Sequence, residues 1–152
     1  MLSGSLNDLG GVAGAIKEEG NRKYVFAYCA AAETIGKVRA ITFDGDVATN
    51  PTAGAPVNLA GYQTIGVATK TTTAAGYLWY QIKGDAKALV EGTTDVAKDD
   101  FLEVLNGETS FKKDNATRSV NSVCIAQEAQ AADASVLTNV YLTGERVIVA
   151  AS

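Results

Sequence analysis

Short extended segments separated by turn-forming residues recur along most of this chain. From residue 21 onward, stretches rich in Val, Ile, Thr and aromatic residues alternate with clusters of Gly, Asn, Asp and Thr, about 8–12 residues apart. No long amphipathic helix is predicted. With 152 residues the chain has room for one domain and an arm. The pattern predicts an all-β protein of about nine or ten strands. We expect a single β-barrel or β-sandwich (β-tulip-like) domain over residues 21–152, preceded by a flexible N-terminal arm over residues 1–20.

The stretch over residues 77–90 lies at the centre of this prediction. It contains the only Trp of the chain and two of its six Tyr, on both sides of Gly84 and Asp85. Bulky aromatic and β-branched residues favour a pleated, half-buried surface. Gly-Asp supplies the positive φ values of a tight turn. The stretch is therefore interpreted as a β-hairpin that reverses at Gly84.

Alternation within this stretch divides its side chains between two faces. Leu78, Tyr80 and Ile82 share one face, which is the better candidate for the core. Trp79 lies on the other face, where an exposed aromatic residue could anchor an interface. The alternative is that Trp79 fills the interior of a closed barrel.

Other turn signals place the remaining strands. Asn106-Gly107 between two extended runs predicts a second hairpin, over residues 101–112. Residues 128–135 are predicted as a loop or a short helical turn. The last segment is expected to form two short strands or one bent strand with a Gly bulge. The other predicted strands cover residues 23–30, 35–43, 62–69, 120–127 and 141–149.

The first 20 residues combine several glycines with apolar residues spaced three or four apart. Glycine disfavours an independent helix by about 1 kcal/mol per residue. Such an arm could become ordered against a neighbour, and the alternative is a frayed terminus. Its apolar anchors are Leu2, Leu6, Leu9, Val12 and Ile16.

Residues 47–61 contain both prolines of the chain, Pro51 and Pro56, among Ala, Thr, Asn and Gly. This composition indicates a surface loop. Its length makes it a candidate contact loop. The preceding Asp44, Gly45 and Asp46 are interpreted as a turn, because the further oxygen ligands and closing Glu of a calcium loop do not follow.

Asp99 and Asp100 are interpreted as turn residues whose carboxylates accept backbone N–H groups. Together with Asp95 they are also the candidates for acid–base chemistry or for a hard cation. The chain has no His, and it contains neither a Gly-x-Ser-x-Gly motif nor a phosphate-binding loop. We expect a protein that is not an enzyme and that holds no cofactor or metal.

The charge and the cysteine content limit the classes of partner and the cellular compartment that we expect for this chain. The net charge is −4 without a basic stripe, which disfavours direct binding of duplex nucleic acid. Cys29 and Cys124 are predicted as two buried thiols in a reducing compartment rather than a disulfide. No signal peptide or membrane-spanning run is recognised, so we expect folding in a cytoplasm and no membrane partner.

The chain from about Gly61 onward resembles capsid decoration, or cement, proteins of tailed bacteriophages, of the kind described as DUF2190-like. The resemblance covers somewhat over half of the chain and rests on barrel-type packing motifs. The residues that carry it are Gly66-Val67-Ala68, residues 76–84 from Gly76 to Gly84, Ala88-Leu89-Val90-Glu91-Gly92, residues 96–102 from Val96 to Leu102, Ala126-Gln127-Glu128-Ala129 and Val140-Tyr141-Leu142.

The resemblance implies a small β-barrel on the outer surface of a virion. It also implies binding to the major capsid protein, bridging of neighbouring capsomers and a homotrimeric state. The alternatives are another virion component, such as a tail-tube, connector or fibre-base protein, or a carbohydrate-binding module that retains a glycan through Trp79 and Tyr80. The candidate interface residues are Leu2, Leu6, Leu9, Val12, Ile16, Pro51, Pro56, Trp79 and Tyr80.

Overall fold

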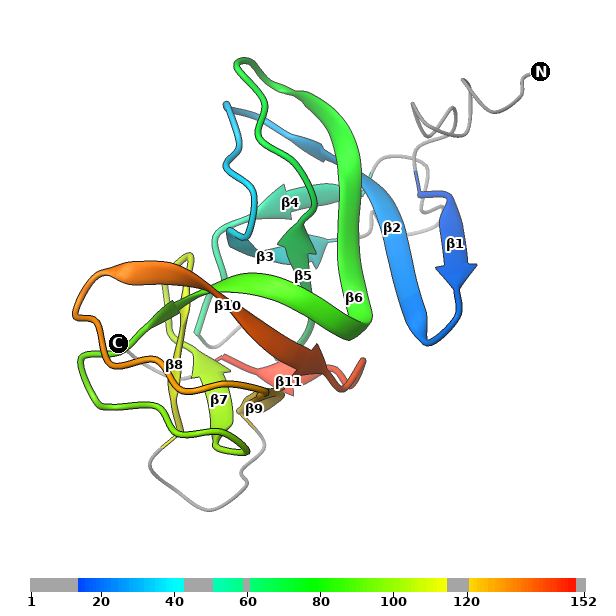
Figure 1. Ribbon diagram of the computed structural model, residues 1–152. Coiled ribbons are helices and arrows are strands. Elements are labelled where there is room, and N and C mark those ends of the chain that lie inside the picture. Colours follow the sequence, from blue (N-terminus) through cyan, green and yellow to red (C-terminus); the bar gives the residue numbers. More distant parts are fainter. Residues whose placement is uncertain (1–13, 43–50, 59–60, 115–120, 150–152) are drawn as a thin grey trace.

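The computed structural model describes residues 14–42, 51–58, 61–114 and 121–149, and within them the chain is all-β (Figure 1). These residues contain no helix, and hence none that could cross a membrane. The predicted all-β class is confirmed. The strands are β1 (Ile16–Glu19), β2 (Arg22–Cys29), β3 (Val38–Thr42), β4 (Thr52–Gly54), β5 (Tyr62–Ala68), β6 (Gly76–Glu91), β7 (Phe101–Val104), β8 (Phe111–Lys113), β9 (Ser122–Ala126), β10 (Ser135–Leu142) and β11 (Val147–Ile148).

One long strand, β6, organises the fold. It is 16 residues long and curves through the middle of the molecule (Figure 1). Residues before Gly84 pair with β2, and residues from Gly84 onward pair with β10. Gly84 has a φ of 92°, and its backbone lies against that of Asn21. The predicted hairpin at this position is therefore wrong, because the positive φ bends the strand instead of reversing it.

The first half of β6 closes a ring of five strands. The pairs run from β2 to β4, β3, β5 and β6, and β6 pairs again with β2. Leu78 and Tyr80 of β6 point into this barrel, as predicted, and Ile82 packs partly against the same cluster. The other interior side chains are Val25, Ala27, Cys29, Ile41, Ala53 and Ala68. β1 extends the ring by pairing with the first four residues of β2, from Arg22 to Val25.

The second half of β6 joins a second ring. Its pairs run from β6 to β10, β9, β7 and β8, and Val90 of β6 pairs in parallel with Phe111 of β8. The interior side chains include Ala88, Val90, Leu102, Val104, Phe111, Cys124, Ala126, Val140 and Leu142. Both predicted buried thiols, Cys29 and Cys124, are free and lie in different rings.

Strands β3 and β5 form the wall between the two cores. Val38 and Val67 belong to the core of the second ring, whereas Ile41 and Ala68 belong to the core of the first. Since both faces of this wall are buried, these strands do not show the apolar–polar alternation of a half-exposed sheet. Gly66 lets the wall approach Tyr80, because a Cβ at this position would lie 3.0 Å from Cβ of Tyr80.

Several local predictions are confirmed. Asn106-Gly107 turns between the antiparallel strands β7 and β8, with a φ of 77° at Gly107. The chain after β10 continues as a separate short strand, β11, beyond Gly144. The predicted strands over residues 23–30, 35–43, 62–69 and 120–127 correspond to β2, β3, β5 and β9.

Several boundaries differ from the prediction. β10 begins at Ser135, whereas the last strands are predicted only over residues 141–149. The loop predicted over residues 47–61 contains β4, which lies between β2 and β3. The arm predicted over residues 1–20 contains β1, whose four residues pair with β2. The predicted turn at Asp44, Gly45 and Asp46 lies outside the described residues.

Candidate interaction surface

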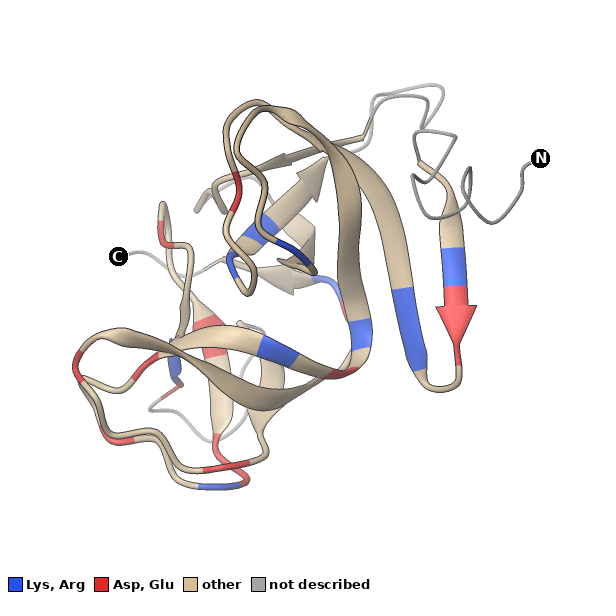
Figure 2. Ribbon diagram, turned by 45° about the horizontal axis from the view of Figure 1, so that its top comes forward, with Lys and Arg blue, Asp and Glu red and all other residues tan. Residues whose placement is uncertain are grey.

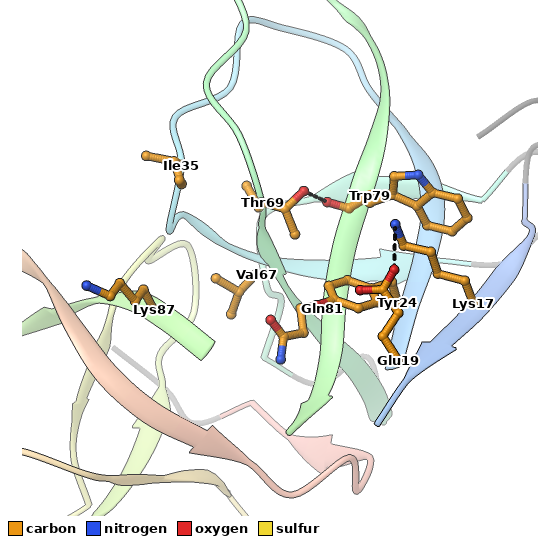
Figure 3. Close-up of a pocket in the computed structure, with 10 residues that line it drawn as sticks. Lys17, Glu19, Tyr24, Ile35, Val67, Thr69, Trp79, Gln81 and Lys87 are labelled. Carbon is orange, nitrogen blue, oxygen red and sulfur yellow. Dashed lines mark hydrogen bonds and ion pairs between the residues drawn. The ribbon is translucent and has the colours of Figure 1, made fainter. Parts of the chain in front are cut away.

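A groove lies on the outer surface of the first ring, beside the bend of β6 (Figure 3). Lys17, Glu19, Tyr24 and Trp79 line one side, and Ile35 and Lys87 line the other (Figure 3). The groove has a volume of about 330 Å³. It brings together side chains from β1, β2, β6 and the loop before β3.

The aromatic side of the groove follows from alternation on two paired strands. Tyr24, Phe26 and Tyr28 of β2 point away from the barrel interior, which Val25, Ala27 and Cys29 occupy. In the register of β2 and β6, Phe26 lies opposite Trp79 and Tyr28 lies opposite Tyr77. The outer face of this strand pair is therefore aromatic.

The aromatic rings contact one another across the two strands. The ring of Phe26 lies 5.3 Å from that of Tyr77 and 5.1 Å from that of Trp79, measured between centroids. Tyr28 and Tyr77 are also 5.3 Å apart. Cross-strand aromatic pairs contribute roughly 0.2–1 kcal/mol each. Phe26 is buried, Trp79 is partly buried and Tyr77 is 38% exposed, so the outer edge of the face is accessible.

Lys17 of β1 places a positive charge on this aromatic surface. Its Nζ lies 4.6 Å from the ring centroid of Trp79 and 5.0 Å from that of Tyr24. It also lies 3.7 Å from Oε2 of Glu19 (Figure 3). A cation above an aromatic ring is favoured by about 0.5–1 kcal/mol at an exposed site. β1 thus contributes charged side chains to the groove and forms part of its wall.

Gln81 holds the floor of the groove at the bend. Its Nε2 donates hydrogen bonds to the carbonyl oxygens of Lys83, at 3.0 Å, and Asp85, at 2.7 Å. These carbonyls lie on either side of Gly84. Asp85 is in turn bonded through its carboxylate to Asn21 and to Gln127. Side chains on both sides of the bend therefore fix its angle.

A buried ion pair supports the loop that carries Ile35. Glu33 is 1% exposed and accepts hydrogen bonds from Nε and Nη2 of Arg39, both at 2.9 Å. The Tyr80 hydroxyl donates to Oε2 of Glu33 at 2.7 Å. The backbone N–H of Glu33 donates to Oγ1 of Thr72. The loop before β3 is thereby attached both to the barrel interior and to the loop before β6.

These contacts shift the ionisation of the pair. Burial raises the pKa of Glu33, but the hydrogen bonds from Arg39 and Tyr80 and the charge of Arg39 outweigh it and leave that pKa below its usual value. Burial and the hydrogen bond to Glu33 raise the pKa of the Tyr80 hydroxyl strongly. Glu33 is thus a carboxylate and Tyr80 a neutral donor near pH 7.

The two halves of the chain differ in charge. Before Gly84 the sequence has seven Lys and Arg against six Asp and Glu, whereas after Gly84 it has six against eleven. Figure 2 shows the basic residues along β1, β2 and β6 near the bend, and most acidic residues in the other half. The excess of acidic residues behind the net charge of −4 thus lies in the half after Gly84.

The predicted interface residues separate into three groups. Ile16, in β1, is 48% exposed, and Trp79 lies at the groove. Tyr80, Pro51 and Pro56 are buried within this chain, so their side chains offer little surface to a partner. Tyr80 fills the first barrel, and both prolines use their carbonyls in backbone hydrogen bonds. Leu2, Leu6, Leu9 and Val12 lie outside the described residues.

Two of the acidic residues considered for chemistry, Asp99 and Asp100, make contacts within the fold. The Asp100 carboxylate accepts the backbone N–H of Ala97 at 2.8 Å and pairs with Nζ of Lys113 at 3.2 Å. Asp99 has a φ of 74° and donates its N–H to the Ala126 carbonyl. Asp99 lies in a turn as predicted, and the predicted acceptance of a backbone N–H is seen for the carboxylate of Asp100. Within the described ranges, no three His, Cys, Asp or Glu side chains are grouped to hold a metal.

The sequence interpretation missed Lys17, Ile35 and Lys87. One available signal is the alternation of Tyr24, Phe26 and Tyr28 within a predicted strand, which marks a continuous aromatic face. No local signal places Lys17 and Lys87 together, because their proximity depends on the bend of β6 and on the pairing of β1 with β2.

Comparisons with known proteins address the fold. No family model matches the chain, and no curated protein matches its sequence. Among solved structures, the head fiber gp8.5 N base of bacteriophage phi29 is similar, with a TM-score of 0.52 at 12% sequence identity. The match covers 82% of this chain and 96% of that chain. At this identity the likeness establishes a shared fold.

Proposed function

We propose that this chain is a structural component of a bacteriophage virion that binds the outer surface of the capsid. The observation that carries the proposal is the likeness to the phi29 head fiber base, which extends over 96% of that chain. The resemblance to decoration proteins in the second half of the sequence supports the same class of protein. The proposal assigns no catalytic step and no cofactor to the chain.

In this proposal the protein stabilises the shell by bridging neighbouring capsomers. The partner is the major capsid protein, and the chain assembles as a homotrimer in the host cytoplasm before or during attachment. Repetition over a shell gives many weak contacts the avidity of a strong one. The exposed edge of the aromatic face, at Tyr77 and Trp79, supplies apolar area for such contacts.

The second candidate is the base of a head fibre. The similar phage structure favours it, since that protein is itself a fibre base. A decoration protein and a fibre base would both bind the capsid, but they differ in what lies beyond them. A decoration protein would end at the barrel surface, and a fibre base would carry a filament outward.

The glycan-binding alternative loses one of its two aromatic residues. Tyr80 is 0% exposed and is bonded to Glu33 within the first barrel. Of the two, Trp79 alone is accessible, at the groove. The virion proposal is the stronger one, because the fold likeness to the phi29 head fiber base supports it.

The proposal is tested on virions of the phage that encodes the chain. Quantitative mass spectrometry should find it in a fixed ratio to the major capsid protein. Gold-labelled antibodies should bind the outside of the head. Particles made without the gene should release DNA at a lower temperature, and added purified protein should reverse this effect. Absence of the chain from purified virions would contradict the proposal.

Two further measurements separate the candidates. Cryo-electron microscopy should show a low knob in the case of a decoration protein, and a projecting filament in the case of a fibre base. Sedimentation of the purified chain should give the mass of three copies. A monomer at micromolar concentration would contradict the trimer.

A further inference from the structure

We propose that the groove beside the bend of β6 binds an acidic peptide segment of a protein partner, with an apolar side chain of that segment lying against Trp79 and Ile35. The partner's identity as a capsid protein rests on the proposed function, but the chemistry of the site does not. The evidence begins with the two lysines and the apolar surface between them.

The first step is the position of the lysines. Lys17 and Lys87 come from β1 and from the second half of β6, and they lie on opposite sides of the groove (Figure 3). Lys17 contacts Glu19 and the ring of Trp79. Among the described residues, no carboxylate pairs with Lys87. A carboxylate entering the groove would therefore meet one uncompensated cation and a second that is only partly compensated.

The second step is the field around the site. All residues that line the groove except Lys87 come from the part of the chain before Gly84, where the sequence has seven Lys and Arg against six Asp and Glu. After Gly84 the sequence has six against eleven. This uneven distribution repels an acidic partner from the second ring and leaves the first ring as the side open to it. The charge distribution thereby orients an approaching acidic partner before any contact forms.

The third step is the apolar surface. Ile35 is 39% exposed, and the partly buried Trp79 lines the same groove. Leu137, 40% exposed, packs close to Gly36 beside Ile35. Large apolar residues next to a pair of cations match a segment in which acidic and apolar side chains alternate.

A nucleic acid fits this site less well. Phosphate backbones need several clustered cations along their path. The groove offers two lysines with the carboxylate of Glu19 next to one of them. The observations therefore favour a peptide carboxylate over a phosphate.

Trp79 is the only Trp of the chain, so its fluorescence reports on the groove without a label. The full chain is titrated with a synthetic pentapeptide of alternating Glu and Leu. We expect a saturable change in Trp79 emission that weakens as salt is raised. The same peptide with Gln in place of Glu should bind about two- to fivefold more weakly for each Glu that pairs with a lysine of the groove.

Matched variants test whether Lys17 and Lys87 bind the acidic peptide. Lys17→Gln and Lys87→Gln should each weaken binding about two- to fivefold, whereas Lys98→Gln, with the same change in charge outside the groove, should not. No change in Trp79 emission, or equal affinities for Lys87→Gln and the unchanged chain, would overturn the inference. Tighter binding of an oligothymidylate than of the acidic peptide would also overturn it.

Virion occupancy distinguishes this failure from failure of the proposed function. If Lys17→Gln and Lys87→Gln decorate particles as fully as the unchanged chain, a capsid protein is not the partner of the groove, while the virion role stands. If the chain binds the acidic peptide but is absent from virions, the groove inference stands and the virion role fails.

Discussion

The hydroxyl of Tyr80 donates a 2.7 Å hydrogen bond to Oε2 of Glu33, which is also bonded by Arg39. Tyr80 is in the first barrel, whereas Glu33 is in a loop between two strands. The bond links a fully buried ring of the core to the loop that forms one wall of the groove. Stability of the barrel and shape of the candidate site therefore depend on the same carboxylate.

Replacing Glu33 with Gln should lower the free energy of unfolding by about 1–3 kcal/mol, because a buried charged acceptor for Arg39 and Tyr80 is removed. Chemical denaturation monitored by Trp79 emission measures the effect. Glu18→Gln is the control, since Glu18 is exposed on β1, and it should change stability by less than about 0.5 kcal/mol. Equal stabilities of the two variants would contradict the role assigned to Glu33.

The free energy of unfolding should depend on pH through the carboxylate of Glu33. Its pKa is lowered in the folded chain from an ordinary value of 4.5, so its contribution is complete above pH 4.5 and is lost as the pH falls through the lower folded value. The unfolding free energy of the unchanged chain should fall more steeply below pH 4.5 than that of Glu33→Gln. Parallel curves for the two proteins would disprove this linkage.

Gly84→Ala should destabilise the fold far more than Gly107→Ala. Both glycines have positive φ, which costs an alanine about 1–2 kcal/mol. At Gly84 the new Cβ would also lie 2.5 Å from the carbonyl oxygen of Asn21, whereas nothing lies within 4 Å at Gly107. We expect losses of at least about 3 kcal/mol and about 1 kcal/mol, respectively. Thermal and urea unfolding measure both, and similar losses would show that Asn21 does not constrain the bend.

Gln81→Leu should remove the hydrogen bonds that span the bend. The carbonyls of Lys83 and Asp85 would lose their side-chain donor, at a cost of about 1–3 kcal/mol. Hydrogen exchange should become faster at the amides of β6 near Gly84. Gln63→Leu is the matched control, because Gln63 bonds an exposed loop at Val57. If exchange near Gly84 is unchanged in Gln81→Leu, the amide does not hold the bend.

Local signals predict local structure well in this chain. Asn106-Gly107 is recognisable because the dipeptide itself fixes the turn. Gly84 is recognisable as a position of positive φ, but the direction of the chain beyond it depends on partners far away in sequence, β2 and β10. The short strand β4 is not predicted, because Pro51 and Pro56 flank it and indicate a loop.

The candidate site is predictable only in part. Alternation places Trp79 on the outer face of β6, and the groove confirms that side. Lys17 falls within the predicted arm, because nothing in residues 16–19 alone indicates pairing with β2. The Glu33–Arg39 pair escapes prediction because a buried carboxylate is identified only once the surrounding strands are placed.

A single strand, β6, belongs to both five-stranded rings. Neither ring is complete without it, so a truncated gene that stops before Gly84 or begins after it should yield no folded fragment. A mechanical force applied to one ring would be transmitted to the other through the continuous backbone of β6. The two rings should therefore unfold together, in one cooperative transition.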